Sequence, residues 1–230
     1  MTTYMEAALQ TVREKNAATE TSTHMATGVL PISIVIACNQ HHQGHQVQKL
    51  NIWLERLFCQ LQQQPVLMHG LELAVISAHD YPTVHQPMAS LESISSIPLL
   101  AARGSKLTLA QSLDTALSML LTRIEEYKQH SLKAKRPWLL IVTDRAGTDY
   151  VDDTRARIER YKASYEVIPF VLNFGDFSPA LAPFSLGRQI NININSTGDI
   201  NQWLVDNLIN VLRTKQGTVH LTPPPQKQAE

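Results

Sequence analysis

The chain has 230 residues, 43% of them apolar, and its 20 lysines and arginines are balanced by 20 aspartates and glutamates. This content suits one large α/β domain with tails, and the absence of long runs of one charge argues against nucleic-acid or anionic-membrane surfaces. Because the chain shows no hydrophobic signal segment, no apolar stretch of the roughly 20 residues that span a bilayer, and only two cysteines, we expect a cytoplasmic protein without membrane partners.

The first predicted strand and the turn after it organise the chain. Residues 31–44 read PISIVIACNQHHQG, in which the β-branched apolar run 32–37 ends in polar residues and Gly44. Such a run is typical of a strand buried on both faces in a parallel sheet. From about His45, apolar residues return at helical spacing and predict a helix. Ligands of open α/β sheets bind at strand carboxyl ends, so residues 38–45 are the first candidate wall of a site.

The remaining elements alternate along the chain. The first helix is expected to end at residues 62–65, where glutamines fray it and Pro65 stops it. Further strands are predicted at 71–78, 82–88, 138–143, 165–174 and 189–195. Further helices are predicted at 107–130, 152–163 and 200–212, with short elements at 90–97 and 179–186. Prolines in the 82–88 segment cannot donate to a ladder, which makes it an edge strand.

This order predicts an α/β fold with a doubly wound, mostly parallel sheet flanked by helices, in a single domain at residues 29–222. Residues 1–28 are interpreted as a weakly ordered N-terminal leader with one short helix at 4–15. Residues 223–230 form a polar, proline-rich C-terminal tail.

Several segments resemble the von Willebrand factor A domains, over about residues 31–223. The sequence RPWLLIVTD at 136–144 is similar to the bacterial tellurite-resistance branch of that family, whose strand ends in Thr-Asp-Gly. The spacing from Gly44 through Leu50 and Leu54 matches the first helix of the branch, and Gly217-Thr218 resembles its closing segment. The resemblance implies a doubly wound fold, a protein-docking role and a bacterial stress-response context.

Such domains usually carry a Mg²⁺ site, the metal-ion-dependent adhesion site, with an Asp-x-Ser-x-Ser signature after the first strand. The resemblance puts Ala37 at the Asp position, and Asn39 and His41 at the two Ser positions. Mg²⁺ requires oxygen ligands near octahedral geometry. Ala37 offers no side-chain oxygen, and the imidazole of His41 suits softer metals.

Two further positions complete the family signature. The family's Thr falls on Ser105, or on Thr108 if the loop is aligned without its apparent insertion. The family's last Asp is Asp144, but Arg145 replaces the glycine that follows it. A guanidinium there could pair with the carboxylate in place of a divalent ion. We therefore expect a degenerate metal site and no cofactor.

The histidine-rich turn permits a second interpretation. His41, His42 and His45 form an HHxxH pattern beside Asn39, and residues four apart share a face on a helix. With Asp144 as a further ligand, this loop would form a transition-metal site. The alternative is a set of solvated loop histidines, because Gly44 disfavours helix at His41 and no Cys or Glu completes the spacing.

A third interpretation is enzymatic. Cys38 and His41 form a C-x-x-H pair before a helix N-terminus, where the helix dipole can lower the pKa of a thiol, and Asp144 could orient the histidine. The alternative is that Cys38 packs as a small buried hydrophobe. We favour the non-enzymatic reading.

The favoured function is a non-enzymatic protein-binding module, an adaptor in a bacterial stress-response or defence assembly. Its partner would dock on loops that meet at one edge of the sheet, residues 39–45, 101–106, 144–150 and 175–178. The residues expected to contact the partner are polar, basic or aromatic, as in protein interfaces. They are Asn39, Gln40, His41, His42, Arg103, Ser105, Lys106, Asp144, Arg145 and Tyr150.

Overall fold

A six-stranded sheet forms the centre of the protein in the computed structural model, with the strand order β3-β2-β1-β4-β5-β6. The structure describes residues 26–149, 152–163, 167–175, 179–185, 189–194, 197–215 and 220–225. The strands are β1 (Leu30–Ala37), β2 (Leu71–Ala78), β3 (Pro82–Ser90), β4 (Trp138–Thr143), β5 (Ile168–Asn173) and β6 (Gln189–Asn191). All neighbours pair in parallel except β3, which pairs antiparallel with β2 at the sheet edge.

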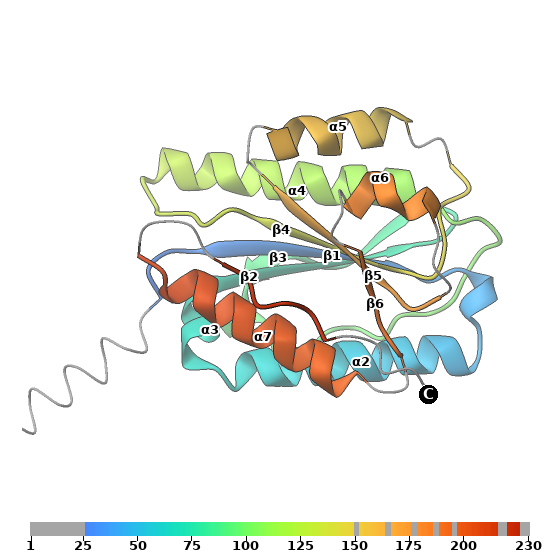
Figure 1. Ribbon diagram of the computed structural model, residues 1–230, viewed down its shortest axis with the longest axis horizontal. Helices are drawn as coiled ribbons and strands as arrows, with labels where there is room; N and C mark the ends of the chain where they lie inside the picture. Colours follow the sequence, from blue (N-terminus) through green and yellow to red (C-terminus); the bar gives the residue numbers. More distant parts are fainter. Residues whose placement is uncertain are drawn as a thin grey trace, which may run out of the picture.

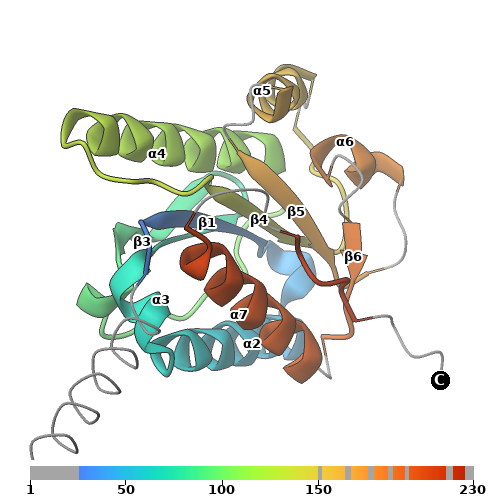
Figure 2. The same ribbon diagram turned by 60° about the vertical axis from the view of Figure 1, so that its left-hand side comes forward.

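Helices cover both faces of this sheet (Figure 1). The helices are α2 (His45–Gln62), α3 (Pro65–Gly70), α4 (Leu109–Gln129), α5 (Asp152–Ala163), α6 (Ala182–Ser185) and α7 (Gly198–Arg213). Three single-turn 3₁₀ helices accompany them: η1 (Gln40–His42), η2 (Leu91–Ser93) and η3 (Pro179–Leu181). Figure 2 shows α4, α5 and α6 on one face and α2, α3 and α7 on the other. The predicted doubly wound fold is therefore confirmed.

The first strand is buried along its whole length because both of its faces are covered. Ile32, Ile34 and Ile36 pack in the core shared with α2, α3 and α7, whereas Val35 and Ala37 pack in the core under α4. Each fully buried aliphatic side chain of this kind stabilises the fold by about 1.5–3 kcal/mol. The uninterrupted apolar run is thus explained by burial on two sides.

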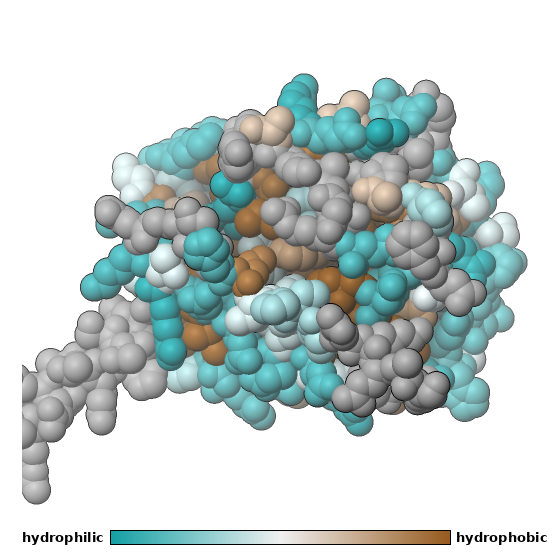
Figure 3. All heavy atoms as spheres, in the orientation of Figure 1, coloured by the Kyte–Doolittle hydropathy of each residue, from teal (hydrophilic) through white to brown (hydrophobic). Residues whose placement is uncertain are grey.

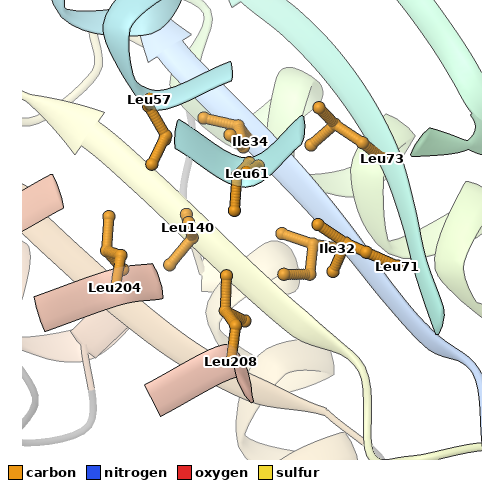
Figure 4. A pocket seen from close by; sticks show the side chains of 9 residues that line it. All are labelled: Ile32, Ile34, Leu57, Leu61, Leu71, Leu73, Leu140, Leu204 and Leu208. Carbon is orange, nitrogen blue, oxygen red and sulfur yellow. The ribbon is translucent and has the colours of Figure 1, made fainter. Parts of the chain in front are cut away.

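The core beneath α2 and α7 contains a small void of about 10 Å³ (Figure 4). Nine aliphatic side chains line it: Ile32, Ile34, Leu57, Leu61, Leu71, Leu73, Leu140, Leu204 and Leu208. This volume is about that of a single water-sized sphere, and the wall offers no polar group to such a water. The void is a packing defect rather than a ligand site.

A buried ionic cluster ties β2 to α4 at the amino end of the sheet. The Arg123 guanidinium donates from Nε and Nη2 to the two carboxylate oxygens of Glu72, at 2.5 and 2.7 Å, and from Nη1 to Glu126 at 2.6 Å. The Tyr127 hydroxyl donates to the same Glu72 carboxylate. Glu72 is only 7% exposed, so the hydrogen bonds from Arg123 and Tyr127 take the place of those that water would make to its carboxylate.

Two predicted elements differ from the structure. Pro65 does not simply stop the first helix but begins α3, because proline at the first helical position loses no intrahelical bond. The alternating run 189–195 pairs as a strand only over β6, although Ile192 and Ile194 still pack against the core. The alternating pattern indicates which side chains face inward, but it does not indicate how many residues pair with the neighbouring strand.

The ends of the chain are described only in part. The expected leader helix at 4–15 lies outside the described residues. Within residues 26–28, Thr27 contacts the end of α7, since its N–H and its hydroxyl both donate to the carbonyl of Leu212. Near the other end, the indole N–H of Trp203 donates to the carbonyl of Thr222 at 2.8 Å.

The surface in Figure 3 is mainly hydrophilic, with apolar atoms gathered in the band between the upper and lower helices. Among the described residues, no helix is both long enough and apolar enough to span a membrane.

Candidate functional site

Four loops converge at the carboxyl edge of the sheet. Three follow β1, β4 and β5 and comprise residues 38–45, 144–149 and 174–175, and the fourth, residues 101–108, leads into α4. We call these four loops together the carboxyl edge. Gln40 N–H of η1 donates to the carbonyl of Gly104 at 2.8 Å. His42 of the same turn reaches Asp144, which directly follows β4. A Cβ on Gly175 would lie 2.6 Å from the carbonyl oxygen of Asp144, so only glycine permits this approach. The loops therefore form one continuous surface at the right-hand end of the sheet in Figure 1.

The Asp144 carboxylate is the centre of this edge, and two neighbours hold both of its oxygens. The His42 ring lies 3.0 Å from Oδ1 through Nε2. The Arg145 guanidinium donates from Nε to both oxygens at 3.0 Å and from Nη2 to Oδ2 at 2.6 Å. Burial alone would raise the pKa of Asp144, but the hydrogen bonds from His42 and Arg145 outweigh it and hold that pKa well below its usual range.

The orientation of His42 is fixed by the backbone of the turn that carries it. The Asn39 N–H donates to Nδ1 of His42 at 3.2 Å, so Nδ1 bears no hydrogen. Nε2 must then carry the ring hydrogen and donate it to Asp144. The ring is fully buried and meets Phe174 edge-on, with centroids 5.8 Å apart. His42 is therefore a positioned donor rather than a free metal ligand.

The loop before α4 is held against β2 by Asp80. The Lys106 N–H donates to Asp80 Oδ1 at 2.8 Å. Gly104 has a positive φ of 68°, and a Cβ there would lie 2.3 Å from the Asp80 carboxylate. Arg103 N–H donates to the carbonyl of Cys38 at 3.3 Å and closes the loop onto β1. These backbone contacts leave the side chains of residues 103, 105 and 106 exposed.

Ser105 and Thr108, the two candidates for the family's threonine position, have different environments. Ser105 is exposed. Thr108 is buried, and its hydroxyl donates to the carbonyl of His79 at 2.6 Å. Asp149 occupies the start of α4, where its carboxylate accepts from the N–H groups of Ala110 and Gln111 at 3.2 and 2.9 Å. The hydroxyl of Thr108 thus holds the loop to His79, and the carboxylate of Asp149 accepts hydrogen bonds from the first turn of α4.

The three histidines of the first turn are not arranged as a shared set of ligands. Gly44, with a φ of 73°, separates η1 from α2, so His41 and His45 do not lie on one helix. Both are exposed, whereas His42 points inward to Asp144. Within the described ranges, no three His, Cys, Asp or Glu side chains are grouped closely enough to hold a metal ion. The alternative in which His41 and His45 share a helical face is therefore not formed, as the position of Gly44 indicated.

The environment of Cys38 opposes the nucleophile interpretation. The residue is fully buried in the core below α2. Burial raises the pKa of the Cys38 thiol to about 11, which is the opposite of the lowering that a reactive cysteine needs. The helix dipole does not overcome this desolvation. Both cysteines, Cys38 and Cys59, are free thiols in the structure.

The residues predicted to contact a partner divide into two groups. Asn39 and His42 are buried and Asp144 is only 7% exposed, so these three cannot form the contact surface themselves. Six lie on the outside: Gln40, His41, Arg103, Ser105, Lys106 and Arg145. Tyr150 lies outside the described residues, as do residues 176–178 of the fourth loop.

Sequence reasoning missed two residues of this edge, Asp80 and Asp149, and one pairing, that of His42 with Asp144. It aligned His41 with a family ligand and did not single out His42 as the partner of Asp144. The only signal was the three-residue spacing from Asn39 to His42, which a 3₁₀ turn converts into a contact. No sequence signal marked Asp80 or Asp149, because their hydrogen bonds go to backbone groups of a distant loop.

Comparison with known proteins identifies the fold but not a family by sequence. No protein-family profile matches the chain, and no curated protein matches it significantly. Among solved structures, it resembles a von Willebrand factor type A protein from Catenulispora acidiphila, with a TM-score of 0.57 and 13% identity over 80% of this chain. Proximal thread matrix protein 1 from the mussel byssus is also similar, with a TM-score of 0.53 and 10% identity over 81% of the chain.

A second structure of the mussel protein, described as having a zinc-occupied metal-ion-dependent adhesion site, matches with a TM-score of 0.55 and 10% identity over 81% of this chain. The matches cover 43%, 49% and 47% of the bacterial and the two mussel chains, so this chain spans less than half of each. At these identities the likeness concerns the fold alone. The chain has the α/β fold of von Willebrand factor A domains.

Proposed function

We propose that this chain is a non-enzymatic protein-binding module whose partner docks on the carboxyl edge, and whose von Willebrand-type metal site is degenerate. The observation that carries the proposal is the engagement of both Asp144 oxygens by His42 and Arg145. A divalent ion would have to displace a buried imidazole and a guanidinium from the Asp144 carboxylate. Ala37, fully buried at the end of β1, adds no oxygen to compensate.

The docking role is what the resemblance to von Willebrand factor A domains implies, and the fold agrees with that resemblance. The exposed side chains of the edge are amide, hydroxyl, imidazole and basic groups on loops held by backbone hydrogen bonds. A partner could therefore contact Gln40, Arg103 and Arg145 without disturbing the core beneath. The adaptor role in a bacterial cytoplasmic stress-response or defence assembly rests on the sequence resemblance to the tellurite-resistance branch.

The test is affinity capture from the native cell with wild type and charge-reversal variants. Arg145→Glu should weaken capture of the specific partner by more than about fivefold, which is about 1 kcal/mol. The matched control is Arg155→Glu on α5, since the two arginine side chains are 46% and 50% exposed and each pairs with a carboxylate. Arg155→Glu should leave capture unchanged, and so should Arg13→Glu in the N-terminal segment.

The variants also separate docking from stability. Arg145→Glu should unfold within a few degrees of wild type, because the Arg145 side chain is 46% exposed and His42 still donates to Asp144, so the loss should stay at about 0–1 kcal/mol, as for surface pairs. If Arg13→Glu or Arg155→Glu abolished capture while Arg145→Glu did not, the partner would dock elsewhere and the proposal would be wrong.

A further inference from the structure

Two histidines connect β2 to β3 beside the carboxyl edge, in a hairpin that comprises residues 71–90. His79 Nε2 lies 2.8 Å from the Thr83 hydroxyl, and His85 Nε2 lies 2.8 Å from the Ser77 hydroxyl. The His79–Thr83 pair joins the end of β2 to β3, and the His85–Ser77 pair joins β3 to β2 directly. The ladder shifts register between Val75 and Ile76, so these side-chain pairs reinforce an irregular part of the hairpin.

Both imidazoles lie where a positive charge is unfavourable. His79 is 4% exposed and packs edge-on against Tyr81, with ring centroids 4.7 Å apart. Burial lowers the pKa of His79; Asp80 raises it in part, and the cation Arg103 lowers it further. Burial also lowers the pKa of His85, and both His79 and Arg103 add to that lowering. If both rings were protonated, they and Arg103 would place three cations near the Asp80 carboxylate.

The hairpin is joined to the carboxyl edge through its backbone and through Asp80. The carbonyl of His79 accepts from both the N–H and the hydroxyl of Thr108, at 2.9 and 2.6 Å. The next residue, Asp80, accepts from the N–H of Lys106. The loop held in this way accepts in turn, at Gly104, from Gln40 of η1. Movement at His79 would therefore reach the turn that carries His42.

We propose that the β2–β3 hairpin is an acid-sensitive latch: protonation of His79 and His85 opens the hairpin and releases residues 103–106 and η1 from their fixed positions. The inference rests on the proposed function only in treating these loops as the docking surface. Its physical core is independent of any partner, because local opening lets the rings reach water and accept protons. The latch holds partner-binding loops in place at neutral pH and loosens them on acidification.

The direction of the pH dependence follows from the lowered pKa values. In the closed hairpin each ring binds protons less readily than a free histidine, whose pKa is about 6.5. The closed state is therefore fully favoured above about pH 6.5 and loses stability as the pH falls from there toward the lowered pKa. Between about pH 7.5 and 5.5, opening should become up to about tenfold more favourable for each histidine.

Amide hydrogen exchange on the full chain, without a partner, tests the latch directly. After correction for intrinsic rates, the wild-type amides of residues 40–42 and 103–108 should lose protection at about pH 5.5 relative to pH 7.5. The double variant His79→Gln/His85→Gln should show equal protection at both pH values. The control double variant His130→Gln/His220→Gln, which removes two exposed histidines outside the hairpin, should behave as wild type.

Two outcomes would overturn the latch. One is a wild-type protein whose protection in these loops does not change with pH, and the other is a double variant that keeps the full change. If the double variant does not fold, the single variant His85→Gln, at the less buried ring, should retain only part of the change. An NMR titration of wild type should place both histidines below the ordinary value, and titration at or above it would also contradict the proposal. A failed partner capture alongside intact latch behaviour would refute the proposed function alone.

Discussion

Two carboxylate–guanidinium clusters lie at opposite ends of the sheet, and they are built differently. At the amino end, Glu72 of β2 meets Arg123 and Tyr127 from α4, so partners distant in sequence are joined. At the carboxyl end, Asp144 meets Arg145, the next residue in the chain, and only His42 comes from another element. The side chains of Glu72 and Asp144 are only 10% and 7% exposed, but those of Arg123 and Arg145 are 33% and 46% exposed.

The comparison separates a cluster that stabilises the fold from one that shapes a surface. All three nitrogens of Arg123 bind carboxylates, and the cluster cannot be opened without separating α4 from β2. Arg145 can swing into water, leaving the strand and the helices in place. The first arginine should therefore matter for unfolding and the second for what the surface binds.

The largest effect is expected at the amino end. Arg123→Ala leaves the buried Glu72 carboxylate without its cation and should lower the free energy of unfolding by about 2–4 kcal/mol. Urea denaturation measures this change. The control Arg155→Ala, which breaks the exposed Arg155–Glu159 pair, should cost less than about 0.5 kcal/mol. Equal losses in the two variants would mean that the cluster does not tie α4 to the sheet.

A smaller loss of stability is expected from changing His42, which is buried beneath the carboxyl edge. His42→Ala removes the acceptor of the Asn39 N–H and the donor to Asp144, and should cost about 1–3 kcal/mol. Its neighbour His41 is exposed, so His41→Ala should change stability by no more than about 0.5 kcal/mol. Thermal unfolding of the two variants tests this order. A larger loss of stability in His41→Ala than in His42→Ala would mean that His41, and not His42, points inward.

The smallest change in stability is expected at Arg145. Arg145→Gln should cost no more than about 1 kcal/mol at neutral pH. Because the bonds from His42 and Arg145 lower the pKa of Asp144 in the folded protein, their contribution is present above the ordinary aspartate value near 3.9 and is lost as the pH falls below it. The difference between variant and wild type should therefore shrink below about pH 4 in denaturation measured across pH. A difference that grew on acidification would assign the effect to another group.

Most of the fold could be predicted because burial on two faces leaves a strong pattern. The runs that became β1 and β4 are apolar throughout, and α4 shows a regular apolar stripe. The end of β6 and the start of α3 could not be predicted as well. Each depends on where a backbone hydrogen bond is available, which side-chain hydropathy does not record.

The candidate site was predictable only as a set of loops. Topology brings residues 40 and 144 together, since carboxyl ends of parallel strands share one edge. Residue 104 lies in the segment that leads into α4, and its carbonyl accepts from the N–H of Gln40. Sequence reasoning also anticipated the pairing of Arg145 with Asp144, because the two are adjacent. Which histidine turns inward was decided by the 3₁₀ geometry of η1 and by Asn39, and the sequence contains no periodicity that reports it.

The central claim is that His42 and Arg145 occupy the Asp144 carboxylate, so that the carboxyl edge works without a divalent ion. Thermal unfolding in millimolar Mg²⁺ or Mn²⁺, with the variant Asp144→Asn as the control for general salt effects, tests it most directly. An ion that binds the folded state and not the unfolded state must raise the melting temperature in a saturable way. The account predicts no such rise in wild type, nor in Ala37→Asp, where His42 and Arg145 still hold Asp144. A saturable rise in wild type that Asp144→Asn abolishes would contradict it.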